Sequence, residues 1–284
     1  MEIKTVGVIG CGLMGSGIAE NCARKGYRTI VREVNDELLA KGMKALQSSV
    51  ARAVEKGKAT QEEATSALAR LTGTTDLAAL SECDLVIEAI IENMAEKKTL
   101  FRALDGICPP HAILASNTSS LCITEMASVT RRGGQVLGMH FFNPVPVMPL
   151  VELVRTILTS DATLEAAKAF GAALGKAVIV AKDTPGFIVN LLLVPYLLDA
   201  VRALENGVAT KEDIDAGMKL GCSHPMGPLT LLDFVGLDTA YYIAGVMFEE
   251  FKDSRYAAPP LLKRMVLAGQ YGRKSGKGFY DYGK

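Results

Sequence analysis

The chain has 284 residues, of which 49% are hydrophobic; this is enough to form more than one core and favours two domains. Its 31 basic residues balance 31 acidic ones, so no net charge indicates binding to nucleic acid or to an acidic membrane. The six cysteines form no CxxC pair and no cluster with histidine, which predicts buried thiols in a reducing compartment and no metal site. A strand-like segment begins directly after residues 1–4, so we expect no targeting segment and a cytoplasmic location.

The first part of the chain alternates between strand-like and helix-like segments. Thr5–Ile9 is a β-branched strand, and a helix-like run follows it as far as Lys25. Arg28–Arg32 is the next strand, and helices are expected over Asp36–Lys58 and Gln61–Arg70. Further strands are predicted at Asp84–Ile87, Ala112–Ala115, Val136–Met139, Leu150–Val154 and Ala177–Val180. This alternation predicts an α/β domain with a doubly wound, mostly parallel sheet.

The sequence pattern changes after Asp183-Thr184-Pro185-Gly186, where a Pro-Gly pair is typical of a domain boundary. Helical periodicity then dominates, so we expect residues 1–184 to form the α/β domain and residues 185–284 an all-helical one. The longest apolar stretch, Gly186–Val201, is interrupted by an amide, a proline and a carboxylate. It therefore favours a core helix over a membrane span.

A GxGxxG motif lies between the first strand and the first helix. It consists of Gly10, Gly12 and Gly15, with Leu13 and Met14 inside it. Glycines at these positions let the backbone turn tightly and approach a pyrophosphate that sits on the helix N-terminus. Because the flanking strand and helix are both present, the motif predicts a Rossmann-type dinucleotide-binding site.

An acidic residue ends the second strand, where such a site binds the adenosine ribose. This residue is Glu33, about twenty residues after the glycines. Its carboxylate would repel the 2′-phosphate of NADP, so NAD is the expected cofactor. Arg32 stands beside it and could accept that phosphate, which keeps NADP as the alternative.

Two ionisable residues interrupt apolar, strand-like runs in the segment Met139–Glu152. His140 ends one such run and Glu152 lies within the next. Burying either charge unpaired would be costly, whereas pairing them would orient the imidazole as a general base. The other histidines favour structural roles, because His111 follows two prolines in a turn and His224 lies in a proline-rich loop.

Other polar residues near strand ends are candidates for ligand contact. The segment Ser116–Ser120 follows one strand, although such a run is also typical of a turn and a helix N-cap. Asn143 comes shortly after His140. Asn190 is the single amide within Phe187–Val194; a buried amide needs partners, and a ligand carbonyl could be one.

Several sequence blocks, in order along the whole chain, resemble the L-3-hydroxyacyl-CoA dehydrogenase family and especially its bacterial short-chain 3-hydroxybutyryl-CoA members. The blocks are GCGLMGSGIA, DLVIEAIIEN, LASNTSSL, GMHFFNPVPVM, DTPGFIVN, HPMGPL and GRKSGKGFYDY. The resemblance implies an N-terminal NAD-binding domain, a helical C-terminal domain that forms a homodimer, and an active site between the domains. It also implies interconversion of the thioesters acetoacetyl-CoA and (S)-3-hydroxybutyryl-CoA.

The resemblance assigns roles to individual residues. His140 matches the catalytic base, Glu152 its orienting partner, and Ser119 the serine that hydrogen-bonds the reacting oxygen. Asn190 matches the asparagine near the substrate carbonyl. Positions associated with NAD, besides the glycine motif, Glu33 and Ser119, are matched by Glu92, Lys97, Asn143 and Lys274. Positions that meet the phosphates of CoA are matched by Arg52 and Lys56.

Three positions depart from residues that are frequent in the family. Pro149 stands where many relatives have lysine, Leu191 where many have arginine, and Thr230 where many have glutamate. None of these changes removes a proposed catalytic group.

Two other functions compete with this interpretation. One is an NAD-dependent dehydrogenase of a free hydroxy acid or sugar acid on the same fold, which would not depend on CoA. The other is a non-catalytic NAD-binding protein. The set Ser119, His140, Glu152 and Asn190 argues against the second, because binding by itself requires none of these residues.

Overall fold

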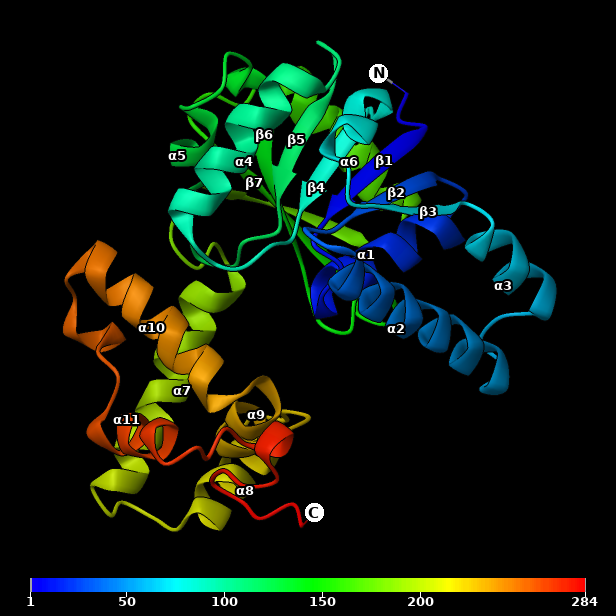
Figure 1. Cartoon of the computed structure of the whole chain (residues 1–284). Coiled ribbons are helices and arrows are strands. Elements are labelled where there is room, and N and C mark those ends of the chain that lie inside the picture. The colour runs from blue at the N-terminus through cyan, green and yellow to red at the C-terminus, as the bar shows by residue number, and fades with distance from the viewer. Residues whose placement is uncertain (1, 284) are drawn as a thin grey trace. The chain divides into compact units, whose positions relative to one another are not determined.

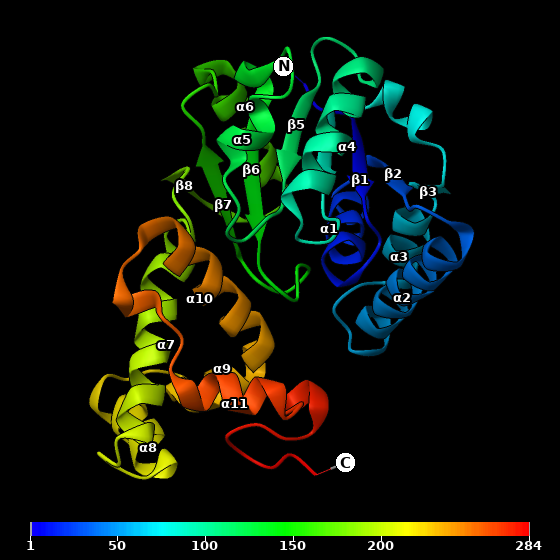
Figure 2. The ribbon, with the colours of Figure 1, turned by 60° about the vertical axis from the view of Figure 1, so that its left-hand side comes forward.

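The computed structural model describes residues 2–283, and the chain divides into two compact units, Met1–Thr184 and Pro185–Lys284. Within the described residues, the named strands all belong to the first unit, and the second unit is built from helices (Figures 1 and 2). The expected fold class is confirmed: a Rossmann-type, mostly parallel sheet with flanking helices is followed by a helical domain.

One sheet of eight strands organises the first unit, in the order β3-β2-β1-β4-β5-β6-β7-β8. The strands are β1 (Thr5–Ile9), β2 (Arg28–Arg32), β3 (Leu71–Thr74), β4 (Leu85–Glu88), β5 (Ile113–Ser116), β6 (Val136–Phe141), β7 (Leu150–Arg155) and β8 (Ala177–Lys182). Neighbouring strands run parallel, except that β6 and β7 are antiparallel. The strand order reverses between β1 and β4, and open α/β sheets bind ligands at such a point.

Helices cover both faces of this sheet (Figure 1). They are α1 (Leu13–Arg24), α2 (Asp36–Glu55), α3 (Gln61–Leu68), α4 (Met94–Ile107), α5 (Ile123–Ala127) and α6 (Asp161–Ala173), with short 3₁₀ turns η1 (Leu77–Glu82) and η2 (Gly133–Gln135). Side chains of α1, α2 and α6, such as Ile18, Leu46 and Phe170, share one core with the sheet. α4 and α5 lie on the opposite face.

The alternation of side chains along β6 decides which face carries His140. Leu137, Met139 and Phe141 belong to the core under α1. Gly138 faces the other way, because a side chain there would overlap Ile123 of α5. Successive side chains of a strand point to opposite faces, so His140 shares the α5 face with Gly138.

The second unit packs its helices around an apolar core of its own. The helices are α7 (Val189–Glu205), α8 (Lys211–Gly221), α9 (Pro228–Val235), α10 (Leu237–Phe251) and α11 (Pro260–Leu267), with 3₁₀ turns η3 (Ser254–Tyr256) and η4 (Arg273–Ser275). Leu198, Leu232 and Ala244 are fully buried in this core. The buried Asp233 carboxylate accepts from the amides of Phe279 and Tyr280, both at 2.9 Å, and so fixes the C-terminal segment.

No single helix among residues 2–283 is both long and apolar enough to cross a membrane. The helices α9 and α10 reach that length and composition only as a pair, with a bend of 95° between them.

Two expectations are corrected by the structure. Strand β3 was not predicted, because its sequence Leu-Thr-Gly-Thr carries no strong pattern; it forms by pairing with the edge of β2. The prediction of buried thiols is wrong for Cys222, which is exposed just after α8, and Cys122 is only partly buried. The four other cysteines are buried, and all six are free: Cys11, Cys22, Cys83, Cys108, Cys122 and Cys222.

The buried thiols make the free energy of unfolding depend on pH. Burial raises the pKa of Cys11 and Cys108 to about 11, and that of Cys22 and Cys83 to about 12, from an ordinary value of 9.0. Unfolded thiols therefore lose their protons first as the pH rises. Their contribution to stability is complete below about pH 9 and is lost as the pH approaches 11 to 12.

We expect the free energy of unfolding to fall between about pH 9 and pH 10.5, as measured by urea denaturation with reductant present. Cys22→Ala removes one of the ionisable thiols and should make this decline shallower, whatever its effect on stability at pH 8. An identical slope in the variant would contradict the prediction.

Candidate active site

The glycine motif forms the tight connection between β1 and α1. Gly10 has a φ of +89°, which other residues rarely adopt, and its amide donates to the Arg32 carbonyl at 2.9 Å. A side chain at Gly10 would overlap the Ala89 carbonyl, and one at Gly15 would overlap the Gly10 carbonyl. These two glycines are required by the packing of the loop itself.

Gly12 is different, because a Cβ atom built on it would meet nothing within 4 Å. It is the N-cap of α1 and offers no side-chain hydrogen bond to the amides of the first turn. The next residue, Leu13, is 72% exposed, and Met14 is partly exposed. Because free amides at a helix N-terminus bind phosphate, the open space over Gly12 fits the close approach of a dinucleotide pyrophosphate.

Glu33 follows β2 and lies against the glycine loop. Its Oε1 accepts from the Cys11 amide at 2.6 Å, and its Oε2 accepts from the Val34 amide at 2.9 Å. Each oxygen retains a lone pair, so the partly exposed carboxylate can also accept from ribose hydroxyls. The neighbouring Arg32 donates through Nε to the Thr75 carbonyl at 3.3 Å, which anchors its guanidinium beside the end of β3.

His140 and Glu152 are direct partners in the antiparallel register of β6 and β7. Directly opposed residues have side chains on the same face and close together. The His140 Nδ1 lies 2.6 Å from the Glu152 Oε2. The imidazole is 6% exposed and the carboxylate is fully buried. The structure thus brings the two residues together, as the sequence led us to expect.

The pairing decides which nitrogen of His140 carries a proton. An ionised carboxylate only accepts hydrogen bonds, so we assign the proton of the neutral imidazole to the Nδ1 that faces Glu152. The ring of Phe142 packs against the imidazole with centroids 4.5 Å apart, which further fixes its plane. An imidazole held in this way can take up or release a proton at Nε2.

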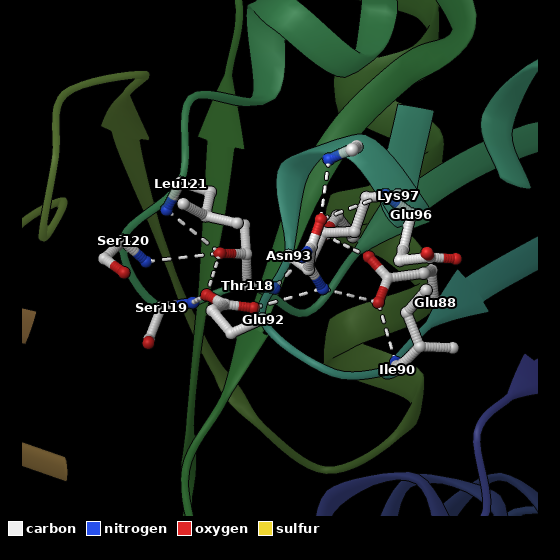
Figure 3. Close-up of polar contacts among 12 residues, drawn as sticks. Glu88, Ile90, Glu92, Asn93, Glu96, Lys97, Thr118, Ser119, Ser120 and Leu121 are labelled. Atoms are coloured by element: carbon white, nitrogen blue, oxygen red, sulfur yellow. Dashed lines mark hydrogen bonds and ion pairs between the residues drawn. The ribbon is translucent and has the colours of Figure 1, made fainter. Parts of the chain in front are cut away.

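A second cluster of charges, of which Glu88 and Lys97 are buried and Glu92 is partly exposed, lies where β4 ends and α4 begins (Figure 3). Lys97 is 1% exposed, and its ammonium lies 2.6 Å from Glu88 and 3.1 Å from Glu92. Glu88 is fully buried and also accepts from the Ser116 hydroxyl at 2.6 Å and the Ile90 amide at 2.7 Å. Two carboxylates therefore share one ammonium, and hydrogen bonds compensate the rest of their burial.

Glu92 connects this cluster to the loop that carries Ser119, as Figure 3 shows. Its Oε1 accepts from the Thr118 hydroxyl and, at 3.2 Å, from the Ser119 amide. The Thr118 hydroxyl oxygen in turn accepts from the amides of Ser120 and Leu121, at 3.3 and 3.0 Å. The position of Ser119 is therefore set by a network that begins at the buried Lys97.

The alternative interpretation of the serine segment, as a helix N-cap, is wrong. The N-cap of α5 is Cys122, whose side chain makes no capping hydrogen bond. The first amides of α5 bond instead to Asp183, which accepts from Ile123 at 3.1 Å and from Thr124 at 2.5 Å. The serine segment is thus not committed to capping the helix.

Three expected ligand contacts lie on the surface of the first unit. Asn143 is exposed and precedes a cis peptide bond to Pro144. Arg52 lies in the last turn of α2 and Lys56 is its C-cap, both exposed. Among residues 2–283 neither basic side chain forms an ion pair, so both charges are available to an anionic ligand.

Two expected contacts belong to the second unit. Asn190 lies in the first turn of α7 and is partly buried. Lys274 lies in η4, where its Nζ is 2.7 Å from Asp238 Oδ2. The histidines set aside from the sequence have local partners: His111 contacts Asp84 at 3.0 Å, and His224 contacts the Tyr196 hydroxyl at 3.2 Å.

Sequence reasoning missed Glu88, and it named Asn117 and Thr118 only as members of the segment Ser116–Ser120, without a role of their own. A signal for Glu88 was present, because it is a carboxylate that directly follows the apolar run Leu85–Ile87. Asn117 and Thr118 carried no such signal, since asparagine and threonine are ordinary residues in a turn.

The contrast between the glycines gives a test of the cofactor site. Gly12→Ala should fold normally, because its methyl group enters open space, yet bind NADH at least about tenfold more weakly. Gly15→Ala should lower the melting temperature, because its methyl group overlaps the Gly10 carbonyl. Thermal unfolding and NADH fluorescence titration measure the two effects. Unchanged NADH affinity in Gly12→Ala would refute the assignment of the pyrophosphate to this loop.

Comparisons to known proteins agree with the fold and with its division into two units. Residues 5–184 match the NAD-binding domain model of 3-hydroxyacyl-CoA dehydrogenase, and residues 186–282 match the C-terminal domain model. A 3-hydroxybutyryl-CoA dehydrogenase of Mycobacterium tuberculosis is 53% identical over 282 residues, covering 99% of both chains. A probable 3-hydroxybutyryl-CoA dehydrogenase of Bacillus subtilis is 49% identical over 282 residues, covering 99% of this chain and 98% of the relative.

A solved structure shows the same architecture. The crystal structure of (S)-3-hydroxybutyryl-CoA dehydrogenase PaaH1 from Ralstonia eutropha superposes with a TM-score of 0.95 at 46% identity, and each chain is fully covered. The matched domains also agree with the two units described above and include the glycine motif, Glu33 and the His140–Glu152 pair. The chain therefore belongs to the 3-hydroxyacyl-CoA dehydrogenase family and is an NAD-dependent oxidoreductase.

Proposed function

We propose that the protein interconverts acetoacetyl-CoA and (S)-3-hydroxybutyryl-CoA, with NAD(H) as cofactor. The observation that carries this proposal is the buried pair of His140 and Glu152, 2.6 Å apart, on the sheet that bears the dinucleotide loop. Oxidation of a secondary alcohol requires a base for the hydroxyl proton and an acceptor for hydride. Relatives that are 53% and 49% identical to this chain in sequence are named as 3-hydroxybutyryl-CoA dehydrogenase and probable 3-hydroxybutyryl-CoA dehydrogenase. These names support this choice of substrate.

His140 acts as the general acid and base through Nε2. In the oxidative direction Nε2 takes the proton of the 3-hydroxyl group, and Glu152 stabilises the imidazolium through Nδ1. In the reductive direction the same imidazolium returns a proton to the substrate oxygen. The Ser119 hydroxyl donates a hydrogen bond to this oxygen and stabilises the negative charge that develops there.

The cofactor supplies hydride exchange when it is bound, and most of the residues proposed to hold it belong to the first unit. Gly10, Gly12 and Gly15 shape the pyrophosphate site, and Glu33 binds the adenosine ribose. Glu92 and Asn143 approach the remainder of the cofactor. Because Lys97 is 1% exposed and bonded to Glu92, we infer that it affects the cofactor mainly by orienting that carboxylate.

The acyl-CoA substrate has its own contacts in the proposal. Arg52 and Lys56, exposed and free of ion pairs among the described residues, attract the phosphates of CoA. Asn190 donates to the thioester carbonyl, and Lys274 completes the cofactor site. We further propose a homodimer that associates through the helical unit, as the family resemblance implies, and a cytoplasmic location.

A spectrophotometric assay of NADH oxidation with acetoacetyl-CoA tests the proposal. We expect turnover with the thioester, little or none with free acetoacetate, and a higher kcat/KM with NADH than with NADPH because of Glu33. Activity on the free acid only would favour the alternative, a dehydrogenase of hydroxy acids or sugar acids. Lack of activity on either, with NADH bound, would favour a non-catalytic protein.

Substitution of the base tests the mechanism. His140→Ala should lower kcat by about 10² to 10⁴ while the protein still binds NADH. Glu152→Gln should also lower kcat, at least about tenfold, because the amide can donate to Nδ1 and stabilise the wrong tautomer. His111→Ala, at an exposed histidine that also contacts a carboxylate, is the matched control and should retain full turnover. Near-normal kcat in His140→Ala would contradict the mechanism.

A further inference from the structure

We propose that Asn117 is a positioning residue that sets the separation between the Ser119 hydroxyl and the His140 imidazole. The inference rests on the proposed function, in which both groups address the same substrate oxygen. Nothing in the sequence resemblance assigned a role to Asn117.

The main-chain pairing of β5 with β6 ends before the catalytic residue. Its last paired residues are Ser116 and Gly138, whereas β6 continues to Phe141. On its other side β6 remains paired with β7 throughout this stretch. The strand end that carries His140 therefore has a main-chain ladder on one side only.

The side chain of Asn117 provides the missing contact. Its Oδ1 accepts from the amide of Phe141, the residue after His140, at 2.9 Å. The backbone N–H of Asn117 donates to the Glu88 backbone carbonyl at 2.8 Å and extends the pairing of β4 with β5 by one residue. Asn117 thus ties together the ends of three neighbouring strands, at the point where ligands bind in such a sheet.

The same residue begins the loop that carries Ser119. Two residues after Asn117, the Ser119 amide is fixed by Glu92 at 3.2 Å, and Thr118 is fixed by the same carboxylate. The loop is therefore held by Glu92 to the segment between β4 and α4, and by Asn117 to β6. A change in the Asn117 contact would alter the distance from Ser119 to His140 without touching either side chain.

A small change in this distance has a large kinetic effect. A misplacement of about 1 Å in a catalytic group can lower the rate about 10²-fold. Asn117→Ala should therefore lower kcat by about 10- to 100-fold, with the KM for NADH within about threefold of wild type. Asn117→Gln keeps the amide but adds one methylene, so it should fold with a similar melting temperature and still lose kcat at least about tenfold.

A double-mutant cycle separates positioning from general stability. In a Ser119→Ala background, where the serine contribution is already absent, either Asn117 substitution should lower kcat by less than about threefold. Equal fold losses in the two backgrounds, or an unchanged kcat in the single variants, would overturn the inference.

A control variant removes a comparable hydrogen bond elsewhere. Ser160→Ala deletes the side-chain bond to the Thr163 amide at the start of α6, 3.2 Å long, and should leave kcat unchanged. The wild-type assay distinguishes two failures. If the wild type does not reduce acetoacetyl-CoA, the proposed function is wrong; if it does but the losses are additive, only the role of Asn117 is wrong.

Discussion

The antiparallel pairing of β6 with β7 is the constraint on which the rest of the site depends. It places His140 directly opposite Glu152, so a fully buried carboxylate meets an imidazole at 2.6 Å. Breaking a buried, hydrogen-bonded charge pair of this kind by removing one partner costs about 3–5 kcal/mol. The same pairing fixes the tautomer of the imidazole, and so a requirement of folding and a requirement of catalysis are met by one contact.

The carboxyl edge of the sheet gathers the other functional groups because the strands beside the switch point all end there. Gly10 follows β1, Glu88 ends β4, Asn117 follows β5, and His140 lies near the end of β6. The glycine loop leads into α1 on one face, whereas alternation along β6 turns His140 to the α5 face. The edge is the place where a ligand held by the loop can reach the imidazole.

The cluster of the buried Glu88 and Lys97 with the partly exposed Glu92 supports this edge of the sheet through ion pairs and hydrogen bonds. Its charges are poor contributors to stability, because desolvation offsets their attraction. Fully satisfied polar networks do, however, specify a single arrangement of the groups bonded to them. Here those groups are Ser116 and the Thr118–Ser119 segment. The network therefore adds little to the stability of the fold, but it fixes the conformation of this loop.

Local patterns determined much of this protein in advance. The glycine motif, its flanking strand and helix, and Glu33 predicted the dinucleotide site, since tight turns and helix N-termini depend on neighbouring residues. Two charges in apolar runs predicted the His140–Glu152 pair, because a buried charge demands a partner. The family resemblance then named the reaction class.

Only the tertiary structure decided the contacts that join different strands. Asn117 meets the Phe141 amide, 24 residues away, and Ser116 meets Glu88, 28 residues away. The weak strand β3 likewise forms only because β2 offers an unpaired edge. Such contacts depend on strand order and register, which no single segment encodes. The sequence by itself therefore indicated the candidate catalytic and cofactor-binding groups, and packing decided which other residues hold them in place.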